Sequence, residues 1–142
     1  MSDISELFTK TLQNNGYSVT KARKAVFGAL DSEEPLEMRK LIKKVGSKFD
    51  RASIYRTVSL FEKLGIIQRL QIGWKYKLEL TDLFNYHHHH VTCISCGIIV
   101  PLREDSMLEA TLNSLAREYG FQPRTHQLEI QGLCRNCQRA NI

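Results

Sequence analysis

The chain has 142 residues, of which 42% are hydrophobic and 25% are charged, and its formal net charge is +5. This length and apolar content suit one compact domain or two small domains with cores of their own. No stretch is apolar over the length of a membrane span, and the N-terminus lacks the apolar region of a secretion signal. These features argue against an integral membrane protein, and we expect a cytoplasmic one.

Positive charge is concentrated in the first half of the chain. Residues 1–80 carry 15 Lys and Arg against 9 Asp and Glu, whereas residues 81–142 carry 5 against 6. Every cysteine and every histidine follows residue 80. This division predicts a module that binds a polyanion, residues 1–81, followed by a metal-binding module, residues 82–142.

The first 46 residues have the apolar spacing of three helices. The first covers about residues 4–12 and ends before the glycine of "NNGY", and the second begins after Thr20, whose hydroxyl can cap it. The third runs from about Leu36 to Gly46. We therefore expect a helical N-terminal region with short turns.

The segment "RASIYRTVSLFEKLG", which begins at residue 51, predicts a fourth helix with two different faces. Ile54, Val58 and Phe61 form an apolar stripe, while the other face begins with polar, basic and aromatic residues. A helix, a short glycine-containing turn and a helix with such a front are typical of a helix-turn-helix. The start of its second helix faces base edges in the major groove. We therefore expect DNA contacts from Arg51, Ser53, Tyr55 and Arg56.

Two strand-like runs, "IIQRLQ" and "KYKLEL", follow this helix on either side of a turn. A hairpin directly after a recognition helix is a wing, where Lys75 and Lys77 are expected to meet phosphate. After residue 80 the pattern changes to strand, strand, helix and strand, with Asp105 or Ser106 as the cap of the helix.

The four cysteines form two C-x-x-C pairs, Cys93 with Cys96 and Cys134 with Cys137. Two such pairs in a cytosolic chain typically close around one zinc ion, and four thiolates leave that ion no open position. Redox-active pairs are the alternative. We expect a structural zinc site that contributes to the folding of the second module.

Four consecutive histidines, His87 to His90, precede the first cysteine pair. On an extended strand, neighbouring side chains point to opposite faces, so His87 would pair with His89, and His88 with His90. Each pair has the spacing of two ligands of one metal ion. Imidazole with carboxylate holds metals more exchangeably than thiolate does, which suits sensing. Occupancy should weaken as the pH falls through about 6.5, because the imidazoles must be neutral.

The sequence lacks the motifs of metal-dependent and thiol-dependent enzymes. No histidine is followed two residues later by glutamate and neither cysteine pair follows proline, as a zinc deaminase would require. The zincin motif is also missing. The run "CISCGIIVPL" continues as a strand, whereas a thioredoxin-like C-x-x-C opens a helix. We therefore expect no enzymatic activity.

Five segments, taken together, resemble one known family. They are "VTKARKAVFGAL", "ASIYRTVSLFEKLGII", "YKLEL", "HHHHVTCISCG" and "THQLEIQGLCRNC", and they span nearly the whole chain. They resemble the ferric uptake regulator family of dimeric, metal-responsive bacterial transcription factors. The resemblance implies an α+β fold, in which an N-terminal winged helix-turn-helix DNA-binding domain precedes a small α/β dimerisation domain with a four-cysteine zinc site. It also implies a homodimer on double-stranded DNA, a structural Zn2+ and a second, regulatory divalent metal, which is Zn2+, Fe2+ or Mn2+.

The resemblance assigns further ligands and DNA contacts by position. Part of a regulatory metal site between the domains is matched by Glu79, His88 and His90. An additional site in the dimerisation domain is matched by His87, His89 and His126, with Glu109 beside the expected acidic position. On the recognition helix, Tyr55 and Arg56 match residues that read bases and phosphates, and Arg23 matches a basic residue near the DNA backbone.

The sequence departs from the family pattern at three usual ligand positions, which hold Pro35, Pro101 and Leu108. Other carboxylates lie near two of them: Glu33 and Glu34 near Pro35, and Glu104, Asp105 and Glu109 near Leu108. Two residues are also inserted before the histidines, so Asp82 competes with Glu79 as the carboxylate of the regulatory site. The metal of that site therefore cannot be assigned by resemblance.

These features lead to the hypothesis of a repressor that binds a near-palindromic operator as a dimer when metal occupies the histidine and carboxylate ligands. The alternative keeps the fold and changes the signal. In that case, iron or manganese held by His88 and His90 would report peroxide through oxidation of a histidine. The prolines at usual carboxylate positions favour the first hypothesis.

Overall fold

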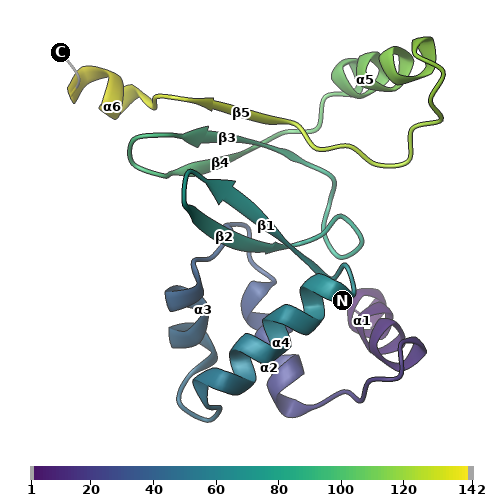
Figure 1. The fold of residues 1–142 in the computed structure, drawn as a ribbon, viewed down its shortest axis with the longest axis vertical. Coiled ribbons are helices and arrows are strands. Elements are labelled where there is room, and N and C mark those ends of the chain that lie inside the picture. Colours follow the sequence, from purple (N-terminus) through teal and green to yellow (C-terminus); the bar gives the residue numbers. More distant parts are fainter. Residues whose placement is uncertain (1, 141–142) are drawn as a thin grey trace. The chain divides into compact units, whose positions relative to one another are not determined.

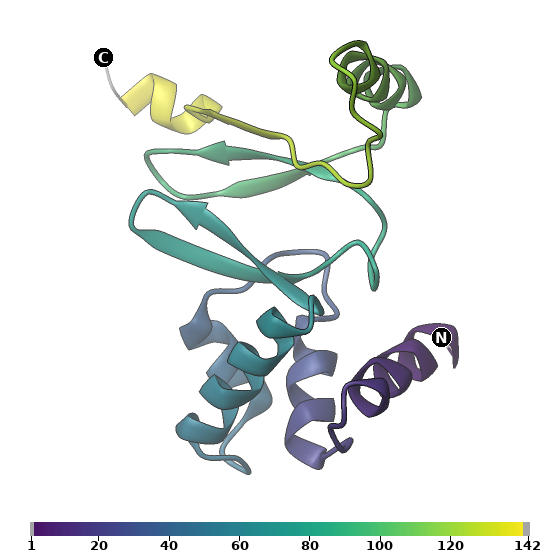
Figure 2. The same ribbon diagram turned by 45° about the vertical axis from the view of Figure 1, so that its right-hand side comes forward.

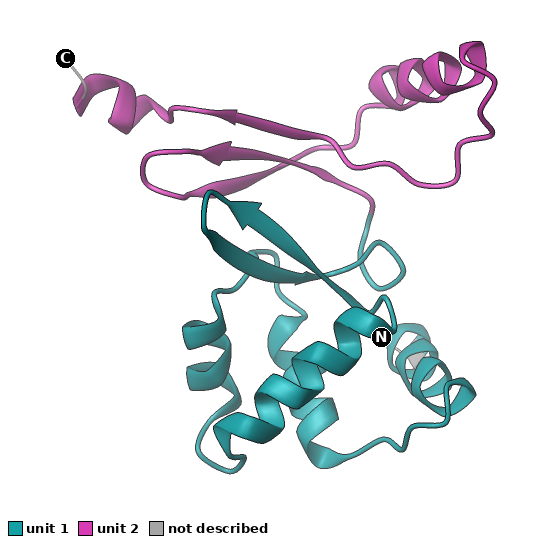
Figure 3. Cartoon of the chain, in the orientation of Figure 1, with its two compact units in different colours: residues 1–86 teal, residues 87–142 magenta. Residues whose placement is uncertain are grey.

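The computed structural model describes residues 2–140, which form two compact units that divide after Tyr86 (Figure 3). The first unit, unit 1, extends past residue 81 because Phe84 is buried in its core, with its ring centroid 5.5 Å from that of Phe27. Within residues 2–140, no helix has both the length and the apolar character needed to cross a bilayer.

Unit 1 consists of four helices followed by a two-stranded hairpin (Figure 1). The elements are α1 (Ser2–Asn14), α2 (Lys21–Leu30), α3 (Met38–Val45), α4 (Arg51–Lys63), β1 (Ile67–Ile72) and β2 (Lys75–Leu80). The strands pair antiparallel from Ile67 opposite Leu80 to Ile72 opposite Lys75. The predicted helix-turn-helix, formed by α3 and α4, and the predicted wing, formed by β1 and β2, are both confirmed.

Local hydrogen bonds explain where the helices of unit 1 begin. The Thr20 hydroxyl accepts a hydrogen bond from the Arg23 amide at 3.2 Å, which caps α2 as predicted. The Asp50 carboxylate accepts one from the Ser53 amide at 2.9 Å, which caps α4. The predicted start of the third helix at Leu36 is wrong. Leu36 forms an antiparallel bridge with Leu78 of β2, with N···O distances of 2.9 and 2.8 Å, so its backbone is extended and α3 begins later.

Aromatic side chains fix the orientation of α4 in unit 1. The Phe8 ring stacks on Phe27 at 4.1 Å and meets Phe61 of α4 edge-on at 5.6 Å. Ile54 and Phe61 are completely buried, and burying a side chain of this size contributes about 1.5–3 kcal/mol. This buried stripe leaves the opposite face of α4, with Tyr55, exposed to solvent.

The second unit, unit 2, contains a three-stranded sheet and two helices. The elements are β3 (His89–Cys93), β4 (Ile99–Leu102), α5 (Ser106–Glu118), β5 (Glu129–Gly132) and α6 (Arg135–Ala140). The strand order is β4–β3–β5, in which β3 is antiparallel to β4 and parallel to β5. The predicted order of strand, strand, helix and strand is confirmed, whereas α6 was not predicted. The strand begins only at His89, because the ladder with β4 starts at the pair His89 and Leu102.

Candidate metal centres and DNA-binding surface

Four cysteines from separate segments of unit 2 come together. Cys93 ends β3, Cys96 lies in the turn before β4, Cys134 immediately precedes α6 and Cys137 lies within it. Parallel pairing of β3 with β5 places Cys93 opposite Gly132 and thereby brings the second cysteine pair beside the first. All four sulfurs lie within 4.8 Å of one another, and the Sγ atoms of Cys96 and Cys134 are 3.8 Å apart.

The electrostatics of this cluster fit a bound cation. All four cysteines are free thiols. Backbone amides, first that of Cys134, which lies 3.3 Å from the sulfur, and then that of Cys96, lower the pKa of Cys93 to about 6. A hydrogen bond with Ser95 acts to lower the pKa of Cys137, but the thiol of Cys134 and burial outweigh it and raise that pKa to about 11. Four thiolates this close would repel one another without a cation, and together they offer the closed, sulfur-only ligand set of a structural zinc ion.

A second cluster in unit 2 joins three imidazoles to one carboxylate. Its members are His87, His89, Glu109 and His126, and their ligand atoms lie within 4.8 Å of one another. The Glu109 carboxylate lies 2.5 Å from His89 Nε2, 2.9 Å from His126 Nε2 and 3.4 Å from His87 Nε2. The Nε2 atoms of His87 and His126 are 3.1 Å apart. The carboxylate therefore lies at the centre of the three rings.

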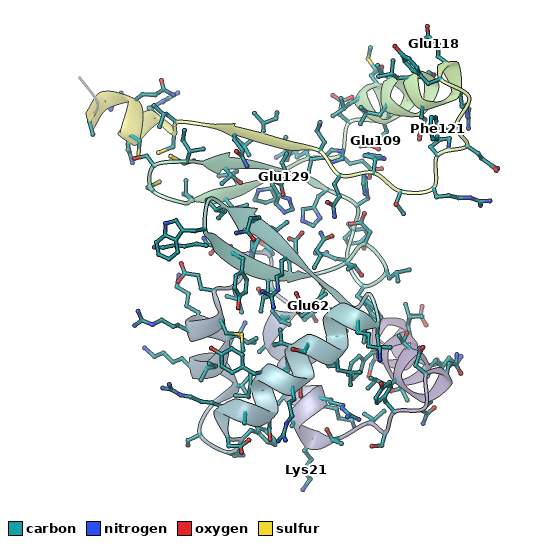
Figure 4. The ribbon with its side chains drawn as sticks, viewed as in Figure 1. Lys21, Glu62, Glu109, Glu118, Phe121 and Glu129 are labelled. Carbon is teal, nitrogen blue, oxygen red and sulfur yellow. The ribbon has the colours of Figure 1, made fainter. Side chains whose placement is uncertain are left out.

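The place where α5 begins explains the position of Glu109. Asp105 caps the helix by accepting hydrogen bonds from the amides of Met107 and Leu108 at 2.9 and 3.1 Å. Glu109 therefore lies in the first turn of α5, near the sheet, whereas Glu118 lies at the far end (Figure 4). Leu108 stands where the resemblance predicts a carboxylate, and the next residue, Glu109, lies among the histidines instead.

The histidines keep Glu109 ionised. Burial acts to raise the pKa of Glu109, but the hydrogen bond with His89 and the charges of His126 and His87 outweigh it, so the pKa is lowered overall. Three imidazole nitrogens and one carboxylate oxygen are a four-member ligand set of the kind that zinc and other borderline first-row metals accept. The residues present therefore fit a divalent metal.

His88 and His90 form the other histidine pair. Their ring centroids are 4.6 Å apart, and those of His87 and His89 are 4.8 Å apart, so the predicted alternation is present although the strand begins only at His89. Pro101 lies directly opposite His90 in the β3–β4 ladder and offers no ligand atom.

The candidate carboxylates of the regulatory site belong to unit 1. Glu79 lies in β2, where it accepts a hydrogen bond from Gln68 Nε2 at 2.7 Å, and Asp82 is exposed in the turn that follows. Because both are in unit 1 and His88 and His90 are in unit 2, a joint metal site stays a prediction.

The predicted DNA-contacting residues lie on exposed parts of unit 1. Arg51, Tyr55 and Arg56 are exposed on α4, and Arg56 Nη2 donates to the Ser53 hydroxyl at 3.2 Å. Hydrogen bonds from Ser53 lower the pKa of Asp50, the cap of this helix. Figure 1 shows this end of α4 next to the turn that joins it to α3. Contact of these residues with DNA stays a prediction.

Two other predicted DNA contacts lie outside α4. Arg23 in α2 donates to the Ser18 carbonyl at 2.5 Å and lies 5.6 Å from the centre of the Tyr17 ring. Lys75 opens β2, and its ammonium lies 5.0 Å from the centre of the Trp74 ring. The sequence pattern does not predict the contact of Lys75 with Trp74 or the hydrogen bond from Gln68 to Glu79. Both contacts depend on the register of the hairpin.

Comparison with known proteins identifies the family. The model of the ferric uptake regulator family matches residues 14–131. The chain is 30% identical over 138 residues to the ferric uptake regulation protein of Synechococcus elongatus, which covers 92% of each chain. The structure is similar to that of the Helicobacter pylori ferric uptake regulator, with a TM-score of 0.79, 24% identity and coverage of 96% of this chain and 93% of that one.

A second solved structure gives the same result. The ferric uptake regulator of Pseudomonas aeruginosa, solved with manganese, matches with a TM-score of 0.75 and 26% identity, covering 95% of this chain and 99% of that one. The winged helix-turn-helix of unit 1 and the donor clusters of unit 2 agree with these matches. The chain therefore belongs to the ferric uptake regulator family, whose members are metal-dependent transcription regulators and not enzymes.

Proposed function

We propose that this chain is a cytoplasmic, dimeric repressor whose affinity for a near-palindromic operator depends on a divalent metal held by histidine and carboxylate. The observation that carries the proposal is the coexistence of two chemically different donor clusters in unit 2, one of four sulfurs and one of three imidazoles with a carboxylate. A four-thiolate site holds structural zinc tightly, whereas imidazole and carboxylate exchange their metal more readily. Four thiolates would therefore maintain the fold, whereas ligands of the histidine and carboxylate kind would report metal supply.

The donor chemistry supports zinc as the first metal to test. Of the four ligand atoms in the second cluster, three are imidazole nitrogens, from His87, His89 and His126, and only Glu109 offers oxygen. Manganese prefers carboxylate, carbonyl and water ligands, while imidazole suits zinc and iron. We therefore rank Zn2+ before Fe2+, and Fe2+ before Mn2+, for this cluster.

The surface of unit 2 supports a homodimer. No residue of α5 is buried, and Met107 on this helix is 80% exposed. Tyr119 and Phe121, just after the helix, and Ile130 on β5 are exposed as well. A small domain cannot leave this much apolar surface in water without losing stability, so a second copy related by two-fold symmetry is the expected cover. Two recognition helices related in this way would reach successive major grooves, about 34 Å apart.

The regulatory switch would depend on ligands from both units. We propose that Glu79 in unit 1 shares an ion with His88 and His90 in unit 2, with Asp82 as the competing carboxylate. The bound cation would supply positive charge that holds these ligands together. The ligands would thereby favour the arrangement of the units that binds DNA, and a bias of a few kcal/mol is enough for such a shift.

The test is operator binding with and without added metal, in protein that keeps its cysteine-bound zinc. A fluorescein-labelled duplex, selected by the protein from a random pool, would be titrated while its fluorescence anisotropy is measured. We expect added Zn2+ to tighten binding roughly 5–150-fold, the usual range of such couplings. Equal affinities in both conditions would exclude the switch.

The double variant His88→Ala/His90→Ala should bind DNA weakly and without response to metal, whereas the nearby Asn85→Ala should respond like the wild type.

Mass spectrometry after treatment with Fe2+ and peroxide tests the alternative of peroxide sensing. Unmodified histidine peptides are expected, and oxygen added to a histidine would instead indicate peroxide sensing.

A further inference from the structure

The wing ends in a tightly defined turn formed by Gly73 and Trp74. Ile72 and Lys75 pair at its base. Gly73 has a φ of 60° and Trp74 does not have a positive φ, which is the pattern of a type II′ hairpin turn with glycine at its first central position. The Gln71 side chain braces the turn by donating from Nε2 to the Gly73 carbonyl at 2.9 Å. The position of Trp74 at the tip is therefore set by the backbone.

Trp74 combines a large apolar surface with a neighbouring cation. It is the only tryptophan of the chain and is 85% exposed. The Lys75 ammonium lies 5.0 Å from the centre of its ring, within the range of a cation–π interaction. Lys77 follows two positions along β2, on the same side of the strand as Lys75. Figures 1 and 2 both show the turn extending beyond the helices of unit 1.

A single exposed apolar side chain is common on protein surfaces and needs no ligand to explain it. Three features distinguish this one: a braced turn presents it, a lysine lies against its face, and the hairpin follows the recognition helix directly. An apolar ring with an ammonium group against its face matches the chemistry of DNA, where apolar sugar walls and base edges alternate with phosphates. Architectural proteins use apolar side chains in the minor groove in this way.

We propose that Trp74 is a DNA-contact residue, whose ring packs against the wall of the minor groove beside the recognition-helix site while Lys75 contacts the adjacent phosphate. This inference rests on the proposed function, since it requires operator binding. The ring makes no base-specific hydrogen bond in this position, so it would respond to groove width, which depends on sequence, rather than to base identity. Trp74 would thus contribute affinity and a preference for the flanks of the operator.

Because Trp74 is the only tryptophan, its fluorescence reports on the wing tip alone. Acrylamide quenching of this fluorescence would be measured on the zinc-loaded protein in three states: without added metal, with Zn2+, and with Zn2+ plus the selected duplex. A label on the DNA reports binding independently. We expect quenching to decrease severalfold only when DNA is added. A decrease with Zn2+ alone would mean that the protein itself covers the ring, and it would overturn the proposal.

Variants of the wing test the contribution to affinity. Trp74→Ala should weaken operator binding roughly tenfold without changing the dependence of affinity on salt, because the ring carries no charge. Trp74→Phe should restore most of the affinity. Lys75→Gln should instead reduce the slope of log affinity against log salt by about one, the effect of losing one phosphate contact. The matched control is Leu83→Ala, which removes a side chain that is 66% exposed outside the wing and should bind like the wild type.

Three outcomes separate this inference from the proposed function. If the wild type binds DNA in response to metal, but Trp74→Ala binds equally well or quenching is unaffected by DNA, only the role of Trp74 is wrong. If the wild type binds no DNA with or without metal, both proposals are wrong. If it binds DNA equally in both conditions, only the metal switch is wrong, and the Trp74 variants still test the contact. Thermal unfolding of each variant confirms that the fold is retained, which is expected because the Trp74 side chain contributes little buried area.

Discussion

Unit 1 is held together by a hydrophobic core of 16 buried residues, whereas the buried positions of unit 2 are mainly cysteine, histidine and threonine. Within the described part of unit 2, only Ile99 is a buried aliphatic residue, and α5 buries none of its side chains. The two units therefore obtain stability from different sources. Unit 1 should fold by apolar burial without metal, while unit 2 should depend on its metal ligands and on a partner subunit.

Loss of the cysteine-bound zinc should have the largest effect and should be confined to unit 2. In a Cys134→Ser variant, the binding energy that holds the two cysteine pairs together is lost, so unit 2 should unfold and the dimer should dissociate. Hydrogen–deuterium exchange should show unprotected amides in residues 87–140 and unchanged protection in α4. Light scattering should report a monomer.

The matched control for this variant is Arg135→Ser, at the exposed position next to Cys134. It should keep both the dimer and the protection. A well-protected unit 2 in the Cys134→Ser protein would show that sulfur is not what maintains this unit.

A cavity in the core of unit 1 should destabilise unit 1 and leave unit 2 unchanged. Phe61 is completely buried and packs edge-on against Phe8, so Phe61→Ala should cost about 3–5 kcal/mol of stability. Urea unfolding followed in unit 1 would measure this loss, while zinc content and the dimer should be unchanged. Phe61→Leu should cost less. If unit 2 unfolded together with unit 1, the comparison between independent units would fail.

The exchangeable metal cluster should be sensitive to one carboxylate. Glu109 lies within 3.4 Å of three imidazoles, so Glu109→Gln should weaken binding of the second metal by at least about tenfold, as changes in metal sites commonly do. Competition with a chromophoric chelator would measure the affinity. Glu118→Gln, on an exposed position at the far end of α5 (Figure 4), is the control. Equal affinities of the two variants for the second metal would show that Glu109 is not a ligand of this site.

The smallest effect should come from a helix cap in unit 1. Thr20→Ala removes the hydrogen bond to the Arg23 amide and should cost about 1 kcal/mol, whereas Thr20→Ser should retain most of the stability. Urea unfolding would compare the two variants. An unchanged midpoint for Thr20→Ala would show that α2 is held by packing alone.

Features with a local cause could be predicted from the sequence. The Thr20 cap, the Asp105 cap and the wing follow from residues near one another along the chain. The alternation of the histidines followed from strand geometry, and the ring contacts within each pair agree with it.

Features with a distant cause could not be predicted. The start of α3 depends on the pairing of Leu36 with Leu78, and α6 follows a parallel strand that only the folded sheet places beside β3. Glu109 could be named as a candidate ligand because it follows Leu108, but its contact with the histidines depends on the rotation of α5 relative to β3. A helical pattern alone does not give that rotation.

Metal counting combined with DNA binding tests the central claim most directly. Protein purified without a tag would be analysed for metal before and after mild chelation, and its affinity for the selected duplex would be measured in both states. If sulfur holds the structural ion and imidazole with carboxylate holds the signal, chelation should leave one zinc per chain, keep the dimer and abolish tight DNA binding, which added Zn2+ should restore. Tight DNA binding that persists after the exchangeable metal has been removed would contradict this account.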